Sequence, residues 1–286
     1  MTKAFQHIGL ITRLMDDKLE VIRSGLVSYL DENHLTHVHG VVTPDRAADD
    51  NLARSLETCD LVIVLGGDGT LLASARLLAS LDKPLLCVNL GRLGFLASVS
   101  PYEMFKALDE ILHGRFIEER RMMLRGEILD EDGTILARGV ALNEVSLHRW
   151  AGLRMVEFET SVDGRFLNQQ RADGLIVATP PGSTAYALSC GGPIVYPTLE
   201  SLVLVPVSPH AMGIRPMTLP GSSQVEITVS PENREAGRVT FDGQGNHVLE
   251  THHRVIIRRH EQGIRLIHPV EYDYFEILRA KLNWGR

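Results

Sequence analysis

Apolar runs and helical patterns alternate along the first third of the chain. Four short apolar runs predict strands: HIGLIT (7–12), HVHGVV (37–42), LVIVL (61–65) and PLLCVNL (84–90). Between and after these runs, apolar positions recur at helical spacing in residues 16–31, 70–80 and 101–114. Because strands that alternate with helices form βαβ units, this part of the chain predicts a parallel sheet covered by helices.

The pattern changes after residue 116. Strand-like segments then follow one another with almost no helical spacing between them, and DEDG (130–133) and VDGR (162–165) are hairpin signals. The last residues, EYDYFEILRAKLNW, again have a helical pattern. We therefore predict an α/β, Rossmann-like N-terminal domain (1–115), a mostly-β C-terminal domain (116–265), and a C-terminal tail (266–286) whose helix packs back on the first domain.

The composition is that of a globular protein with an acidic balance. The 286 residues are 44% hydrophobic and 23% charged, and the formal net charge is −7. This balance argues against nucleic acid as a partner, since nucleic-acid-binding proteins normally have a basic face. A membrane span needs about 18 consecutive apolar residues, and no stretch approaches that length. Three widely spaced cysteines without a CxxC pair predict reduced thiols, and hence a cytoplasmic protein that does not bind membranes.

A glycine-rich turn, LGGDGTLL (65–72), joins a predicted buried strand to a predicted helix. Glycines at such a strand end let backbone N–H groups approach phosphate oxygens, and the helix N-terminus adds positive partial charge. Gly66, Gly67, Gly69 and Thr70 are therefore a candidate phosphate-binding loop. The simpler alternative is a turn in which Asp68 or Thr70 caps the helix. An aspartate facing phosphates would repel them unless it accepts a proton or meets a metal ion, and phosphoryl transfer to an alcohol uses such a proton acceptor.

Two further segments carry polar or small side chains near predicted strand ends. DGLIVATP (173–180) is a strand pattern that runs into STAYALS (183–189), whose small and hydroxyl residues form either a ligand pocket or a helix capped by Ser183 or Thr184. Asn143 and Glu144 are neighbours in LNEVSLHR (142–149). Neighbours on a strand point to opposite faces, so both line one pocket only if the strand ends or bulges there. A polar strand end without a function is the simpler interpretation of this pair alone.

The histidine pairs predict no protein metal site. His37 and His39 have the spacing of one strand face, but two histidines without a third ligand nearby predict surface side chains. The same interpretation applies to His252 and His253.

Taken together, GGDGT (66–70), NE (143–144) and DGLIVATPPGSTAYALSCGGPI (173–194) resemble the bacterial NAD kinase family. GGDG alone is shared with diacylglycerol kinases, sphingosine kinases and phosphofructokinases, whereas the NE pair followed by TPxGSTAY is specific. The resemblance extends from IGLI (8–11) to YFEILRAKLNW (274–284). The family's TPTGSTAY is TPPGSTAY here. Pro181 removes a backbone donor and a hydroxyl but stiffens the turn.

The resemblance implies transfer of the γ-phosphoryl group of ATP to the 2′-hydroxyl of the adenosine ribose of NAD, which gives NADP and ADP. It implies that Asp68 is the proton acceptor, that Mg²⁺ arrives with ATP, and that the enzyme is a homodimer or homotetramer. The second domain would bind NAD. The residues that would contact NAD are Asp68, Gly69, Asn143, Glu144, Arg154, Arg171, Asp173, Thr184, Ala185, Tyr186, Ala187, Leu188, Ser189 and Gln244.

Two other functions are compatible with parts of the pattern. A lipid or sphingoid-base kinase would share the first domain but needs an apolar acceptor pocket, which the polar 182–189 stretch does not suit. A dinucleotide-binding regulator without catalysis would have no use for Asp68 among phosphates. The motifs are compatible with ATP or inorganic polyphosphate as donor and with NAD or NADH as acceptor, and Arg171 resembles the version associated with NAD preference.

Overall fold

The chain forms two compact units. The computed structural model describes residues 3–14, 16–43, 50–91, 94–96, 99–149, 154–233 and 236–284. The first unit comprises residues 1–120 and 264–286, and the second comprises residues 121–263. The sequence-based boundaries were 115/116 and 265/266, so the two estimates differ by a few residues at each junction.

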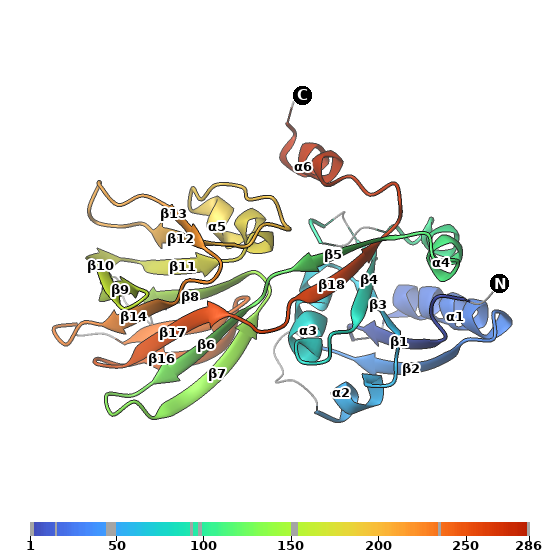
Figure 1. Ribbon diagram of the computed structural model, residues 1–286, viewed down its shortest axis with the longest axis horizontal. Helices are drawn as coiled ribbons and strands as arrows, with labels where there is room; N and C mark the ends of the chain where they lie inside the picture. The colour runs from blue at the N-terminus through green and yellow to red at the C-terminus, as the bar shows by residue number, and fades with distance from the viewer. Residues whose placement is uncertain are drawn as a thin grey trace. The chain divides into compact units, whose positions relative to one another are not determined.

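The first unit is built on one sheet. Its described strands have the order β2-β1-β3-β4-β18-β5, and the neighbours from β2 to β18 pair in parallel (Figure 1). The strands are β1 (His7–Thr12), β2 (Thr36–Val41), β3 (Leu61–Gly66), β4 (Pro84–Asn89), β5 (Ile117–Arg121) and β18 (Ile264–His268). The helices are α1 (Asp17–Glu32), α2 (Asp50–Leu56), α3 (Asp68–Leu78), α4 (Met104–Leu112) and α6 (Tyr274–Leu282).

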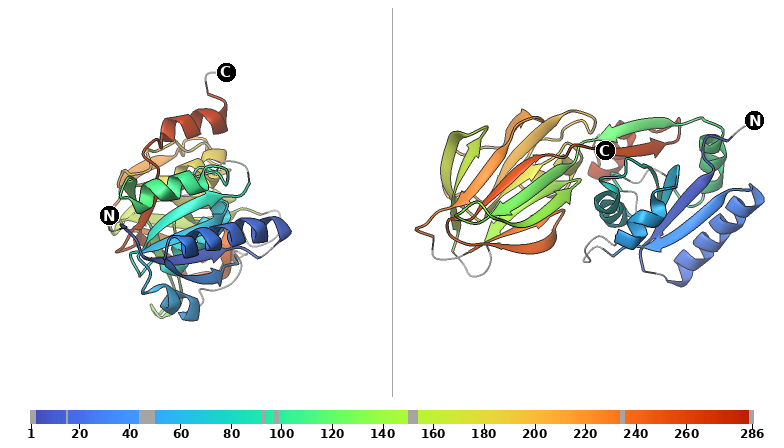
Figure 2. Two further views of the ribbon diagram at one scale, coloured as in Figure 1. Left: turned by 90° about the vertical axis from the view of Figure 1, so that its right-hand side faces the viewer. Right: turned by 60° about the horizontal axis from the view of Figure 1, so that its bottom comes forward.

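Helices cover this sheet because its central strands are apolar on both faces. Every residue of β3 and β4 is buried. Apolar side chains of α1 and α4 share one core cluster with residues of β1, β3 and β4, so these two helices lie on the same face (Figure 2). On the other face Leu56 of α2 packs directly over Gly9 of β1, where an added Cβ would lie 2.5 Å from the leucine side chain. The central strands are therefore covered on both faces, as in other parallel sheets.

The second unit contains two antiparallel sheets. The described strands of one have the order β10-β9-β14-β17-β6-β7, and those of the other β13-β12-β11-β8-β15-β16. The first of these comprises β6 (Leu124–Leu129), β7 (Ile135–Ala141), β9 (Val156–Val162), β10 (Arg165–Ala172), β14 (Val225–Val229) and β17 (Arg254–Arg259). The second comprises β8 (Glu144–Arg149), β11 (Gly174–Ala178), β12 (Ser201–Val207), β13 (Met217–Pro220), β15 (Gly237–Phe241) and β16 (Gln244–Leu249).

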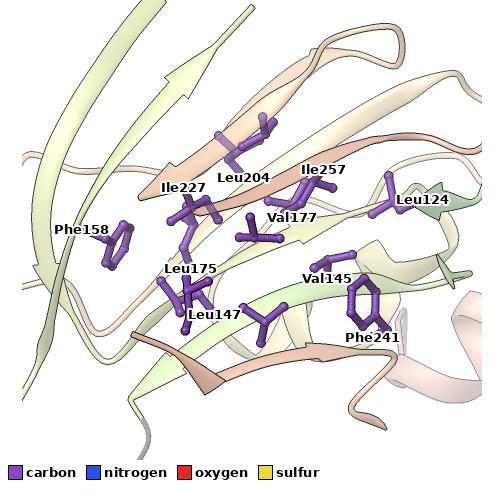
Figure 3. Close-up of a cluster of buried hydrophobic side chains, with 14 of the residues drawn as sticks. Leu124, Val145, Leu147, Phe158, Leu175, Val177, Leu204, Ile227, Phe241 and Ile257 are labelled. Carbon is purple, nitrogen blue, oxygen red and sulfur yellow. The ribbon is translucent and has the colours of Figure 1, made fainter. Parts of the chain in front are cut away.

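Buried side chains from both sheets form the core of this unit. Phe158 of β9 and Ile227 of β14 meet Leu175 and Val177 of β11 in one cluster (Figure 3). The outer face of β11 and β12 is covered as well, because Ala187 of α5 (Tyr186–Ser189) packs on Ile176 and its neighbours. The strand β11 is thus apolar along its whole length, and the segment after it lies against the sheet. The predicted fold class, an α/β domain followed by a mostly-β domain and a C-terminal helix, is confirmed.

Candidate functional site

The glycine-rich turn connects β3 to α3 at the carboxyl end of the sheet. Gly67 is the N-cap of α3 and makes no side-chain cap bond, so the alternative in which Asp68 or Thr70 caps this helix is wrong. Thr70 is buried, and its Oγ1 lies 2.2 Å from the position of a Cβ added at Gly66. A Cβ at Gly69 meets no atom of the described residues within 4 Å. The turn is therefore packed tightly where the chain enters it and open at the first turn of the helix.

The Asp68 carboxylate holds the segment that follows β4. It accepts hydrogen bonds from the backbone N–H of Phe95 at 2.9 Å and of Leu96 at 3.3 Å. Gly94 leaves room for this position of the carboxylate, because a Cβ there would lie 1.9 Å from Asp68 Oδ1. Burial, together with the charge of Asp68, raises the pKa of the Cys87 thiol, which keeps that cysteine protonated. Asp68 is thus a carboxylate with a fixed orientation at a helix N-terminus.

Asn143 and Glu144 stand at the beginning of β8. Asn143 precedes the strand and Glu144 is its first residue, so the condition under which both side chains can serve one pocket is met. Asn143 Oδ1 and Glu144 Oε2 are buried and have no hydrogen-bond partner among the described residues. Burial raises the pKa of the Glu144 carboxyl to about 8, and the charge of Asp242 adds to that effect. Buried polar atoms without partners are rare in folded proteins, and here two occur side by side.

The segment after β11 lies next to this pair. Ala178 of β11 pairs with Glu144, and the N–H of Thr179 donates to the carbonyl of Asn143 at 2.8 Å. The chain then forms the 3₁₀ helix η1 (Pro181–Thr184) and the short helix α5. Pro181 occupies the first position of η1, where a missing N–H costs nothing. A Cβ at Gly182 would lie 2.0 Å from the Asn143 carbonyl oxygen, so glycine is required there.

The hydroxyls of this segment are partly used inside it. Ser183 Oγ donates to Pro180 O and accepts from Val195 N, and Thr184 Oγ1 donates to Pro181 O at 3.0 Å. Neither side chain caps α5, so the alternative of a helix capped by Ser183 or Thr184 is wrong. The ring of Tyr186 is 37% exposed and lies 5.4 Å from the His148 ring, centroid to centroid.

Asp173 is close to this cluster, and the remaining predicted residues lie elsewhere on the unit. Burial raises the pKa of Tyr186, the neighbouring Cys190 adds to the shift, and the charges of Asp173 and Glu144 make smaller contributions. Asp173 also forms an ion pair with Arg149, with 3.6 Å between Asp173 Oδ1 and Arg149 Nη1. Arg171, on β10, forms an ion pair with Glu157, with 3.8 Å between Arg171 Nε and Glu157 Oε2. Arg171 also lines a separate cavity of about 300 Å³, together with Gln169, Gln170 and His210.

Arg154 and Gln244, the last two residues predicted to contact NAD, lie near the beginnings of strands. Asp68 and Gly69 belong to the first unit. Arg154 is exposed just before β9, and Gln244 begins β16 opposite Phe241. The second unit therefore brings together Asn143, Glu144, Asp173 and the 184–189 segment.

Sequence reasoning missed two residues that contact this cluster. Asp242 accepts hydrogen bonds from three consecutive backbone N–H groups at residues 142–144. Thr179 donates through Oγ1 to the carbonyl of Leu142 at 2.5 Å. The signal for Asp242 was the Asp-Gly pair in FDGQ, which is a hairpin turn signal and gives no indication that its carboxylate reaches another strand.

Known proteins resemble this chain over almost its whole length. The ATP-NAD kinase N-terminal domain matches residues 9–116, and the ATP-NAD kinase C-terminal domain matches residues 142–269. An NAD kinase of Halorhodospira halophila is 44% identical over 97% of this chain and 89% of its own length. An NAD kinase of Nitrosococcus oceani is 44% identical over 100% and 99%.

Two solved structures share the fold. The structure of yeast NADH kinase complexed with NADH has a TM-score of 0.85 at 23% identity, covering 98% of this chain and 88% of that one. The structure of an Archaeoglobus fulgidus NAD kinase in complex with ATP has a TM-score of 0.72 at 24% identity, covering 96% and 97%.

Proposed function

Because this chain belongs to the ATP-NAD kinase family and phosphorylates the adenosine ribose 2′-hydroxyl of NAD with ATP, giving NADP and ADP, we propose that Asp68 accepts the proton of that hydroxyl. The hydroxyl is a poor nucleophile at neutral pH, and a base within hydrogen-bond distance accelerates such a step by about 10²–10⁴-fold. The two backbone bonds from Phe95 and Leu96 support this role because they fix the orientation of the carboxylate.

The turn around Asp68 would bind the phosphates of the donor. A helix N-terminus presents backbone N–H groups and positive partial charge, and the open space at Gly69 leaves room for phosphate oxygens to approach the start of α3. We therefore propose Gly66, Gly67, Gly69 and Thr70 as the phosphate-binding loop, with Gly66 and Thr70 shaping it by close packing.

The dinucleotide would be held by the cluster in the second unit. The observation that carries this assignment is the pair of buried, unpartnered oxygens on Asn143 and Glu144, since ribose hydroxyls are donors of the kind these atoms lack. Tyr186 presents a partly exposed ring beside them for an adenine to stack on. The other residues proposed to contact NAD are Asp68, Gly69, Arg154, Arg171, Asp173, Thr184, Ala185, Ala187, Leu188, Ser189 and Gln244.

A divalent ion would come with the nucleotide. In the described part of the chain no three His, Cys, Asp or Glu side chains are grouped to hold a metal ion. Mg²⁺ commonly keeps several waters and is bound by substrate phosphates with one or two carboxylates. We propose that Mg²⁺ is held mainly by the phosphates of ATP, where it neutralises charge during the transfer.

We also propose a cytoplasmic homo-oligomer. Cys59 and Cys87 are buried and Cys190 half-buried, all as free thiols, which fits a reducing compartment. None of the described helices is long and apolar enough to cross a bilayer. Light scattering on the purified protein measures the oligomeric state, and a monomeric mass would contradict this part of the proposal.

Replacing Asp68 by Asn tests the base. We expect NADP formation from NAD and Mg-ATP to fall by about 10²–10⁴-fold, while NAD binding measured by calorimetry is retained. The control is Asp60→Asn, because the Asp60 carboxylate also accepts two backbone bonds, from Gln6 N at 2.7 Å and His7 N at 3.2 Å, at the opposite end of β3. Near-normal turnover in Asp68→Asn, or an equal loss in Asp60→Asn, would contradict the assignment.

A further inference from the structure

The backbone of residues 142–144 is held by one carboxylate. Asp242 Oδ1 accepts from the N–H of Asn143 at 2.7 Å and of Glu144 at 3.2 Å, and Oδ2 accepts from the N–H of Leu142 at 3.0 Å. The N–H of Asp242 donates in turn to the carbonyl of Glu144 at 2.9 Å. Three N–H bonds to one carboxylate make an anion site formed by the backbone, occupied by a side chain 98 residues away from Glu144 in sequence.

The geometry of a tight turn places this carboxylate. Asp242 and Gly243 form the two-residue connection between β15 and β16, and both have positive φ, 52° and 71°. A turn of this type normally lies at the surface and fixes only the hairpin register. Asp242 is instead 8% exposed, since β15 pairs with β8 and the turn therefore lies at the start of β8.

Thr179 holds two of these three residues, Leu142 and Asn143, through their carbonyls. Its Oγ1 lies 2.5 Å from the carbonyl oxygen of Leu142 and 3.1 Å from that of Asn143, and its N–H donates to the Asn143 carbonyl. Gly182 N donates back to Thr179 Oγ1 at 3.1 Å. The β15–β16 turn thus binds the backbone N–H groups of residues 142–144 and the carbonyl of Glu144, whereas the segment after β11 binds the carbonyls of Leu142 and Asn143.

This two-sided attachment fixes the backbone from which the side chains of Asn143 and Glu144 project. We infer that Asp242 is a positioning residue of the dinucleotide site: by binding the backbone N–H groups of residues 142–144, it holds the oxygens of Asn143 and Glu144 where the ribose hydroxyls meet them. The inference rests on the proposed function, in which these two side chains contact NAD.

The charge of Asp242 has a second effect on the same site. Hydrogen bonds from three backbone N–H groups favour the charged form of a carboxylate, and the Asp242 carboxylate lies beside the buried Glu144 carboxyl. Two buried neighbouring carboxyls do not both carry a charge readily, so Glu144 holds the proton and can donate a hydrogen bond as well as accept one. Burial and this charge together raise the pKa of Glu144 to about 8.

Asp242→Asn is the test, because it keeps the shape of the side chain but turns an N–H donor toward one of the three backbone donors. We expect the KM for NAD to rise about tenfold or more while the KM for ATP changes little, since losing a hydrogen bond to a charged group costs at least the equivalent of a factor of ten. A residue with only a structural role would lower stability and the active fraction without moving the KM for NAD.

The matched control is Asp163→Asn. Asp163 occupies the same position in the two-residue Asp-Gly turn between β9 and β10, with φ of 51°, and its carboxylate accepts from Gln224 N at 2.8 Å. Because Asp163 accepts one exposed bond where Asp242 accepts three, we expect a smaller loss of stability in this variant, with both KM values unchanged. An equal rise of the KM for NAD in both variants would overturn the inference.

Two further variants separate this inference from the proposed function. Asn143→Ala and Glu144→Gln test whether those side chains contact NAD. If both leave the KM for NAD unchanged, the proposed site is wrong. If they raise it and Asp242→Asn does not, the positioning role is wrong. Should Asp242→Asn fail to fold, Thr179→Val removes the hydroxyl bonds of the opposite attachment at nearly constant volume and keeps its backbone N–H bond. An unchanged KM for NAD in that variant overturns the role of the two-sided attachment.

Discussion

At the residue scale, the Glu144 carboxyl makes stability depend on pH in an unusual direction. Its pKa is raised from 4.5 to about 8 in the folded protein, first by burial and then by the charge of Asp242. Between these two values the folded state holds a proton that the unfolded state releases. Stability from this group is therefore fully present below pH 4.5 and is lost as the pH rises through 8.

Glu144→Gln tests this direction, because glutamine has nearly the same shape and no titratable proton. We expect the free energy of unfolding of the parent to fall between pH 5 and pH 9 by more than that of the variant, with a difference on the order of a few kcal/mol. Urea unfolding at several pH values measures it. Parallel pH profiles of the two proteins would show that Glu144 is already ionised at neutral pH.

At the element scale, the contact between η1 and the start of β8 depends on a missing side chain. A Cβ at Gly182 would lie 2.0 Å from the carbonyl oxygen of Asn143, and backbone cannot yield as a flexible side chain does. We expect Gly182→Ala to push η1 away from β8, to lower the melting temperature, and to weaken NAD binding about tenfold or more, since Asn143 would shift.

Gly213→Ala is the control for this variant. A Cβ at Gly213 meets no described atom within 4 Å, so the same substitution adds a methyl group without a clash. We expect its stability to stay within about 0.5 kcal/mol of the parent, with NAD binding unchanged. Calorimetric unfolding and NAD titration of both variants measure these effects, and equal behaviour of the two would contradict the importance of the close approach.

The elements were largely predictable, because their patterns are local. The continuous apolar run of β3 and the helical spacing of α1 each depend on burial that repeats along one segment. The contacts at the candidate site were not predictable from the sequence. Asp68 was expected as a cap or a base, and it also binds two backbone groups 27 and 28 residues further along the chain. A sequence pattern does not encode which distant amide a carboxylate meets, since that depends on the packed sheets.

At the scale of the whole molecule, each unit has its own core. Phe158 is fully buried in the cluster between the two sheets of the second unit, whereas a separate cluster lies between the sheet of the first unit and the helices α1 and α4. We expect Phe158→Ala to destabilise the second unit by about 3–5 kcal/mol. Hydrogen exchange should show lost protection in β9, β11 and β14 and unchanged protection in β1 and β3.

Phe166→Ala is the matched control, because this phenylalanine is on the neighbouring strand β10 and is 64% exposed. We expect it to change stability by about 0.5 kcal/mol at most. If Phe158→Ala lowers protection equally in both units, their cores do not act separately and this interpretation of two units is wrong.

The position of β18 has a consequence for the order in which a newly made chain can fold. This strand lies between β4 and β5 in the first sheet, yet it follows the whole second unit in the sequence. While the ribosome is still making residues 121–263, β4 has an exposed edge with unpaired backbone groups, which is a risk for aggregation. The first unit is therefore synthesised first but completed last. The second unit can finish folding before β18 has been made and added to the sheet of the first unit.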